Sequence, residues 1–137
     1  MTELNRSAAT LRLFGDDLVP DEVSRMLGAT PTACHAKGEQ SLPNVGGRTF
    51  NARTGTWRLQ AADRCPADLD GQVVELLSQL TPDLEVWSRL AACFRVDVFC
   101  GLFLNESNEG VSLSPGTMKA LGERSILLDL DVYSNDD

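Results

Sequence analysis

The clearest strand pattern in the chain is FRVDVFCGLFL, residues 94–104. Apolar side chains occupy every second position from Phe94 to Leu104, and they alternate with Arg95 and Asp97 in the first half. Successive side chains of a strand point to opposite faces. This alternation therefore predicts a sheet with one face packed on a core and a second face that carries charged and aromatic side chains.

The remaining elements follow from the same kind of pattern. The predicted strands and extended segments are 8–14, 30–35, 55–60, 111–113 and 125–133. Helices are predicted where apolar residues recur three and four positions apart, and their first turns are marked by Pro20, Asp68, Thr81–Pro82 and Ser114–Pro115. The sheet residues expected in the core are Leu11, Leu13, Trp57, Leu59, Val96, Val98, Leu128 and Leu130.

A weak internal repeat bears on the fold class. LVPDEV at 18–23 aligns with LSPGTM at 113–118, and each copy follows one strand and precedes another. This suggests two strand–helix–strand halves that share one sheet. We therefore expect an α+β fold with an antiparallel sheet and helices mainly on one face, arranged as a ferredoxin-like sandwich with pseudo-duplicated halves.

The length of 137 residues fits one domain over 1–137. The polar ends, 1–7 and 134–137, are expected to be flexible. The segment 36–53 reads as a long loop that carries Lys37 and two arginines, and such a loop is either functional or mobile.

Charge is unevenly distributed along the chain. Residues 1–64 contain eight basic and seven acidic residues, a net charge of +1, whereas residues 65–137 contain four and thirteen, a net charge of −9. Such a surface would repel nucleic acid and could attract a basic protein, or it could simply keep the protein soluble. With no membrane-length apolar run and no signal peptide at residues 1–6, we expect a cytoplasmic protein that does not bind membranes.

The reactive residues do not form a recognisable catalytic or metal-binding set. The four cysteines lack paired zinc spacing, and the only histidine, His35, would point away from its neighbour Cys34 on a strand. Asp129 and Asp131 share one face, where a pair of carboxylates could hold a cation or transfer protons, but no histidine or third ligand supports them. We expect no catalytic residue, metal or cofactor, and we lean against an enzyme.

The polar face of the sheet is the most suggestive feature. Alternation places four aromatic residues there, Phe14, Phe99, Phe103 and Tyr133, among charged residues. Either this is a solvated sheet face, or it is a binding surface, since aromatic and arginine side chains are enriched in interfaces. The predicted binding residues are Arg12, Trp57, Arg58, Arg95, Asp97, Asp129, Asp131 and Tyr133.

Four segments resemble a known family: LRLFGDDLVPDEV at 11–23, TGTWRL at 54–59, VSLSP at 111–115 and LDLDVY at 128–133. Their order and spacing resemble the bacterial domain-of-unknown-function family 4279 over roughly residues 9–133. Members usually carry an acid where this chain has Val19, so the first helix has a weaker cap. The resemblance implies a small bacterial α+β protein and no activity, cofactor or site residue.

Three functions remain open at this point. The first is a non-catalytic protein-binding module, for example an acidic inhibitor or immunity-type protein that covers a basic partner. The second is a small-molecule-binding domain or enzyme, in which the basic 36–53 loop, Arg58 and Trp57 hold an anionic ligand above a pocket. The third is a homodimer whose seam is the sheet face.

Overall fold

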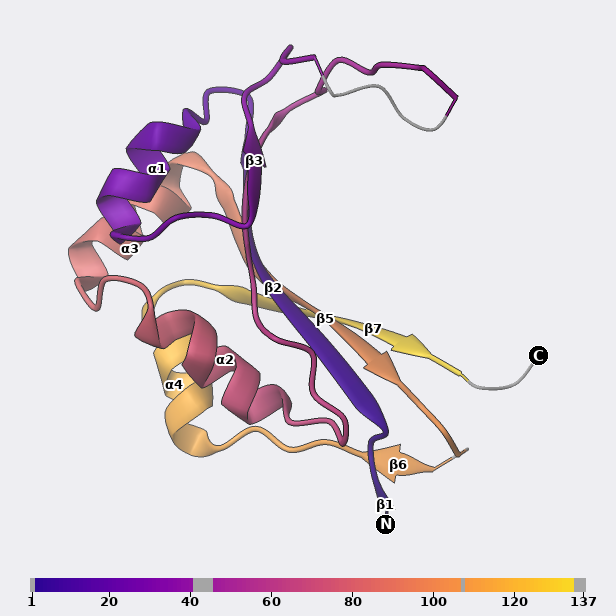
Figure 1. Cartoon of the computed structure of the whole chain (residues 1–137). Helices are drawn as coiled ribbons and strands as arrows, with labels where there is room; N and C mark the ends of the chain where they lie inside the picture. Colours follow the sequence, from indigo (N-terminus) through magenta and orange to yellow (C-terminus); the bar gives the residue numbers. More distant parts are fainter. Residues whose placement is uncertain (1, 41–45, 107, 135–137) are drawn as a thin grey trace.

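A five-stranded sheet with helices on one side forms the body of the molecule (Figure 1). The computed structural model describes residues 2–40, 46–106 and 108–134. Within them the elements, in chain order, are β1 (Thr2–Glu3), β2 (Arg6–Gly15), α1 (Pro20–Leu27), β3 (Ala33–His35), β4 (Gly55–Gln60), α2 (Leu69–Ser78), α3 (Leu84–Cys93), β5 (Arg95–Phe103), β6 (Glu109–Gly110), α4 (Pro115–Glu123) and β7 (Leu127–Tyr133). The α+β class and the one-sided helix layer are confirmed.

The sheet is mixed, so the prediction of a purely antiparallel sheet is wrong. Its strand order is β3-β4-β2-β5-β7, and β2 pairs antiparallel with both β4 and β5. The pair β5–β7 is parallel because α4 carries the chain back along the helix side before β7 begins. The first copy of the weak repeat leads from β2 to β3, which is separated from β2 by β4, whereas the second copy leads to β7, which pairs directly with β5. Neither a ferredoxin-like sandwich nor duplicated halves are confirmed.

The core lies between the sheet and the helices. Six of the eight sheet residues expected there are buried, with exposures of 5% or less: Leu11, Leu13, Trp57, Leu59, Val96 and Val98. The helices complete it with Val23, Leu27, Leu69, Val73, Leu76, Trp87 and Leu90.

The last strand departs from this expectation. Leu128 is only half-buried and Leu130 is 48% exposed, so the prediction that Leu130 is buried is wrong. The reason is position in the sheet, because β7 is an edge strand and runs out beyond the helix layer (Figure 1). Ile126, just before β7, is 7% exposed, and its N–H donates to the carbonyl of Leu121 on α4 at 3.0 Å.

The described part of the N-terminal segment makes contacts with the rest of the molecule. β1 pairs with β6, and the Leu4 side chain is 3% exposed. Ser7 is fully buried, and its hydroxyl donates to Gln72 Oε1 at 2.6 Å while it accepts the N–H of Asp68 at 3.0 Å. Ser7 resembles a surface residue in the sequence, but a buried amide on α2 satisfies it. Of the two ends, residues 1 and 135–137 lie outside the described part.

The long segment 36–53 is closed at its base by hairpin-like hydrogen bonds. The N–H of Gly38 donates to the carbonyl of Ala52 at 2.8 Å, and the N–H of Ala52 donates to the carbonyl of Glu39 at 2.9 Å. An isolated bridge joins Gln40 and Asn51. The segment thus extends from the β3–β4 end of the sheet, and its residues 41–45 lie outside the described part (Figure 1).

Helix starts are mostly as predicted. Pro20 and Pro115 occupy first positions, and Asp68 caps α2 by accepting the N–H of Gly71. The third helix begins at Leu84 rather than Pro82, because Asp83 supplies the capping carboxylate to the N–H of Glu85. None of the helices in the described ranges is long and apolar enough to cross a membrane.

Candidate functional site

Seven of the eight predicted binding residues lie on the side of the sheet that none of the described helices covers, called the open face below. Strand register places Arg58 beside Arg12, and Arg12 beside Asp97, in one row across β4, β2 and β5. The next rows carry Phe99 beside Asp129 and Phe103 beside Tyr133. The open-face residues used below are Arg6, Thr10, Arg12, Phe14, Arg58, Gln60, Arg95, Asp97, Phe99, Phe103, Leu127, Asp129, Asp131 and Tyr133.

A salt-bridge network occupies the centre of the open face. Arg12 donates from Nε and a terminal nitrogen to the two carboxylate oxygens of Asp97, each at 2.8 Å, and the Asp97 side chain has no exposed surface. Asp129 lies 3.7 Å from Arg12, and Arg95 lies 3.5 Å from Asp97. The hydrogen bonds to Asp97 raise the pKa of Arg12 above its ordinary value. Arg12 and Asp97 therefore neutralise each other.

Aromatic rings flank these charges. The Arg12 guanidinium lies over the Phe99 ring at 4.4 Å, and that of Arg6 lies over the Phe103 ring at 3.9 Å. Phe103 stacks on Tyr133 with ring centroids 4.8 Å apart. Gly101 leaves room for this stack, since a Cβ there would lie 3.2 Å from the Phe103 ring. The sequence pattern does not single out Arg6, because residues 1–7 are expected to be flexible, although Arg6 continues the alternation of the predicted strand 8–14 by two positions.

The end of β7 adds a polar contact to this aromatic pair. Tyr133 is hydrogen-bonded to Asp131, and this bond raises the pKa of the phenol above its ordinary value. Tyr133 is 44% exposed and Leu127, on the same face of the strand, is 53% exposed. The β7 side of the open face is thus acidic and apolar together.

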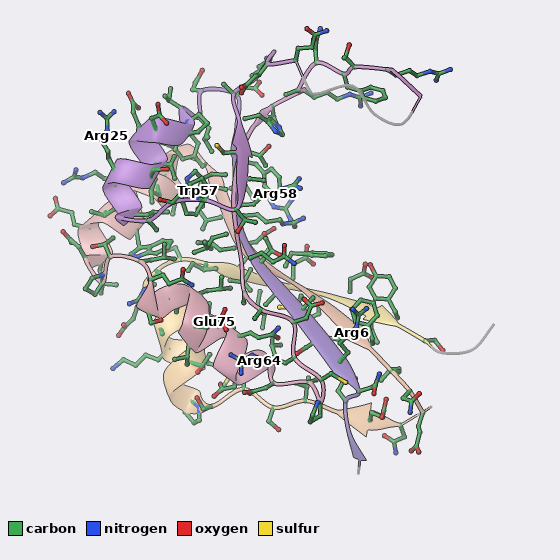
Figure 2. All side chains as sticks on the ribbon, viewed as in Figure 1. Arg6, Arg25, Trp57, Arg58, Arg64 and Glu75 are labelled. Carbon is green, nitrogen blue, oxygen red and sulfur yellow. The ribbon has the colours of Figure 1, made fainter. Side chains whose placement is uncertain are left out.

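Trp57 is the predicted binding residue that lies off the open face. It points to the helix side, opposite its neighbour Arg58, as Figure 2 shows, and it has no exposed surface. Its indole N–H donates to the Ser24 hydroxyl of α1 at 3.0 Å. A ligand on the open face cannot contact this ring, so Trp57 anchors α1 to the sheet.

A hollow of about 320 Å³ opens on the β4 side of the open face, and we call it the Arg58 hollow. The described residues that line it are Thr10, Arg12, Thr32, Ala33, Arg58, Gln60 and Phe99. No carboxylate is among them, although the protein has a net charge of −8.

A second hollow, of about 380 Å³, lies beneath the 36–53 segment, where the small-molecule hypothesis requires a pocket. Its described lining contains Glu39 and Phe50 but no arginine or lysine. The basic loop residues and Arg58 are therefore not brought together there. Nearby, the Thr56 hydroxyl and His35 Nε2 are 2.6 Å apart, a pair that the register of β3 on β4 creates. Thr56 is 2% exposed, so this pair holds β3 in place.

The neighbours Cys34 and His35 separate as alternation predicts. Cys34 pairs in register with Trp57 and His35 with Thr56, positions that face opposite sides. All four cysteines are free, and burial raises the pKa of the Cys100 thiol to about 12. Within the described ranges, no group of three or more His, Cys, Asp or Glu side chains is placed to hold a metal ion.

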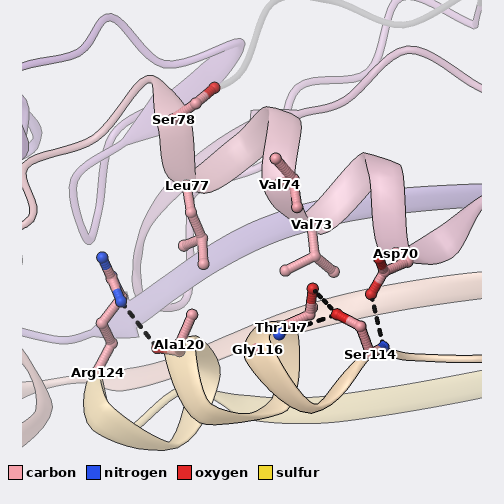
Figure 3. A pocket seen from close by; sticks show the side chains of 10 residues that line it. All are labelled: Asp70, Val73, Val74, Leu77, Ser78, Ser114, Gly116, Thr117, Ala120 and Arg124. Atoms are coloured by element: carbon pink, nitrogen blue, oxygen red, sulfur yellow. Dashed lines mark hydrogen bonds between the residues drawn. The ribbon is translucent and has the colours of Figure 1, made fainter.

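A third hollow, of about 420 Å³, runs between α2 and α4 (Figure 3). Its walls are apolar, from Val73, Val74 and Leu77. Asp70 at one end accepts the N–H of Ser114 at 2.9 Å, which lowers the pKa of that carboxyl, and Arg124 at the other donates to the carbonyl of Ala120 at 3.0 Å. These end groups serve helix capping and packing.

Comparisons with known proteins bear on the family alone. A family described as a domain of unknown function, DUF4279, matches residues 2–135 of the 137-residue chain. No curated protein and no solved structure matches the chain. Because the match covers nearly every residue, from β1 through the end of β7, the chain belongs to the DUF4279 family.

Proposed function

We propose that this protein is a non-catalytic binding module that receives another protein on its open face. The observation that carries the proposal is a five-stranded sheet with one face left without helices, on which aromatic rings lie against arginines. Such side chains contribute much of the binding energy of protein interfaces, since they bury large areas at a low cost in conformational entropy.

The charges on the open face suggest the chemistry of the partner. Asp129 and Asp131 make the β7 side acidic, which fits a partner with basic groups there. Arg58 makes the opposite side cationic. A partner with both signs would match better than a uniformly basic one, because like charges brought together at an interface cost free energy. An inhibitor or immunity-type protein that covers a partner's basic surface is one form of this proposal.

The cysteines indicate the cellular compartment in which the protein would act. All four are free, and three of them are exposed. Free exposed thiols suit a reducing compartment. We therefore propose action in the bacterial cytoplasm.

The test is affinity capture with two charge-matched double variants. Arg58→Glu with Leu127→Lys alters two exposed positions of the open face, whereas Arg25→Glu with Val74→Lys alters two exposed positions on the helix side (Figure 2 shows Arg25 and Arg58 on opposite sides). We expect a protein from the native cell lysate to bind the parent and the helix-side variant. Once that protein is purified, the open-face variant should bind it about tenfold or more weakly, a loss of 1.4 kcal/mol or more.

The other outcomes are equally informative. Equal binding by the two variants would exclude the open face as the interface. If no protein is captured and sedimentation shows that the parent dimerises while the open-face variant does not, the face is a seam between two copies, which is the homodimer hypothesis.

A further inference from the structure

We propose that the Arg58 hollow binds a carboxylate group. This deepens the proposed function and rests on it, because the hollow lies on the open face and the proposal names the group that an occupant would insert. Three features of the hollow favour a carboxylate: an unpaired guanidinium, unused hydrogen-bond donors around it, and an apolar boundary.

The first feature is the unpaired guanidinium of Arg58, which contrasts with that of its neighbour Arg12. Arg12 and Arg58 lie side by side in register, and Arg12 is neutralised by Asp97. Arg58 is exposed, and its side chain has no hydrogen bond or ion pair in the part of the chain that the structure describes. Its guanidinium presents a planar fork of N–H donors that matches the two oxygens of a carboxylate.

The second feature is the set of hydrogen-bond donors around Arg58. The side chains of Thr10 and Gln60 line the hollow without a hydrogen-bond partner among the described residues. The Thr32 hydroxyl accepts the N–H of Gln60 at 2.9 Å, which leaves its own proton free to donate. No described lining residue carries a competing negative charge. An anion entering the hollow would therefore meet donors on several sides.

The third feature is the apolar boundary of the hollow. Phe99 contributes a ring to the lining, and Ala33 lies beside Arg58 on β3. A volume of about 320 Å³ falls at the lower end of the range of small-ligand sites. The described lining of the hollow offers one unpaired guanidinium, that of Arg58, and the protein has a net charge of −8, which together favour a monoanion over a phosphate dianion. A carboxylate attached to a flat apolar body fits this combination.

The experiment is an NMR titration that follows the Arg58 side chain and the backbone amides of Thr10, Ala33 and Gln60. Benzoate is the probe for a free carboxylate, and benzamide is its uncharged counterpart. A short extended peptide with one central Glu, compared with the same peptide carrying Gln, is the probe for a protein side chain. Arg58→Gln is the test variant and Arg25→Gln, on the helix side, is the matched control; circular dichroism confirms that both fold.

We expect saturable shifts with a carboxylate probe and none with its neutral counterpart. Affinity should fall about tenfold or more in Arg58→Gln and stay unchanged in Arg25→Gln. Preference for the Glu peptide over benzoate would assign the hollow to a partner's acidic side chain, and the reverse preference would assign it to a free small carboxylate.

Three results would overturn the inference: no saturable shift with either carboxylate, equal affinity in Arg58→Gln, or tighter binding of inorganic phosphate at the same residues. Its failure is distinguishable from failure of the proposed function. If a captured partner binds Arg58→Gln as tightly as it binds the parent, the open face is still a protein interface, but the carboxylate site is rejected. If benzoate binds but no protein partner is found, the carboxylate site is supported and the proposed protein-binding function is rejected.

Discussion

The carboxylate of Asp97 has no exposed surface, although it lies on the open face, which none of the described helices covers. Arg12 covers it, and the Phe14 and Phe99 rings flank the Arg12 guanidinium at 5.0 and 4.4 Å. Burial of this charge is tolerated because both carboxylate oxygens accept N–H groups. Arg12 and Asp97 therefore have a structural role in the open face, whereas the Arg58 side chain is available to bind a partner.

Arg12→Ala should lower the free energy of unfolding by about 3–5 kcal/mol, because it removes both hydrogen bonds from Arg12 to a buried carboxylate and leaves Arg95, at 3.5 Å, as its cationic neighbour. Arg58→Ala is the matched control, since Arg58 lies beside Arg12 in the same row and is exposed. That variant should change stability by no more than about 0.5 kcal/mol. Urea unfolding measures both.

A second-site change checks the cause. In Asp97→Asn the charge that needs Arg12 is gone, so Arg12→Ala should cost at least about 1 kcal/mol less there than in the parent. Similar costs for Arg12→Ala in both backgrounds, or for Arg12→Ala and Arg58→Ala in the parent, would contradict the assigned structural role.

The reactivity of individual cysteines tests whether the core is closed to solvent. Cys100 is buried on the helix side of β5, and its thiol pKa of about 12 keeps it protonated at ordinary pH. Native protein treated with iodoacetamide at about pH 8 should therefore be alkylated at Cys34, Cys65 and Cys93 and not at Cys100, as judged by peptide mass spectrometry. Alkylation of Cys100 before unfolding would show that β5 is accessible from the helix side.

At the scale of elements, β7 differs from the strand at the centre of the sheet. β2 is paired on both sides and is covered by helices, so its alternating residues Ala9, Leu11 and Leu13 have no exposed surface. β7 has the same alternation in sequence, but among the described strands it is paired only with β5, and Leu130 and Val132 are 48% and 56% exposed. Alternation identifies a strand and its faces, while coverage depends on where the strand lies.

Leu130→Thr should therefore change the free energy of unfolding by no more than about 0.5 kcal/mol. Leu11→Ala, in the fully covered strand, should cost about 2–5 kcal/mol because it leaves a cavity in the core. Thermal or urea unfolding of the two variants gives the comparison. A loss for Leu130→Thr as large as that for Leu11→Ala would mean that something covers this side of β7 in solution.

At the scale of the whole molecule, polar contacts tie the helix layer together over long sequence distances. The Gln72 side chain on α2 donates to the carbonyls of Ser7 and Ala62, each at 2.9 Å. Asp70, two residues earlier on the same helix, accepts the N–H of Ser114 at the start of α4. These contacts connect α2 to the first long strand and to the last helix.

Asp70 makes the docking of α4 sensitive to acid. The N–H of Ser114, followed by the Thr117 hydroxyl, lowers the pKa of this carboxyl below its ordinary value of 3.8. A carboxyl with a lowered folded-state pKa stabilises the fold above the unfolded value, and this stabilisation is lost as the pH falls from about 3.8 through the lower folded value.

Asp70→Asn should therefore be less stable than the parent at neutral pH, and the difference should shrink as the pH falls below about 3.8. Urea midpoints measured for both proteins across this range test the expectation. Parallel curves with a constant gap would show that the charge of Asp70 is not what holds α4.

Local patterns in the sequence determined a large part of this fold. Alternation and helical spacing identified the long strands, the four helices and most of the core, because these depend on which side chains are apolar and on caps such as Asp68 and Ser114. They also placed Arg12, Arg58, Asp97 and Tyr133 on one face, since parity along a strand needs no knowledge of its neighbours.

Only the tertiary structure decided how those strands lie next to one another. The parallel β5–β7 pair, the exposed end of β7 and the buried Ser7 depend on contacts between segments far apart in the chain. So does the difference between two adjacent arginines, one neutralised by Asp97 and one left unpaired among the described residues. Pairing energies between strands and across the core are not encoded in any local pattern, and they determine which predicted surface residues are free to bind.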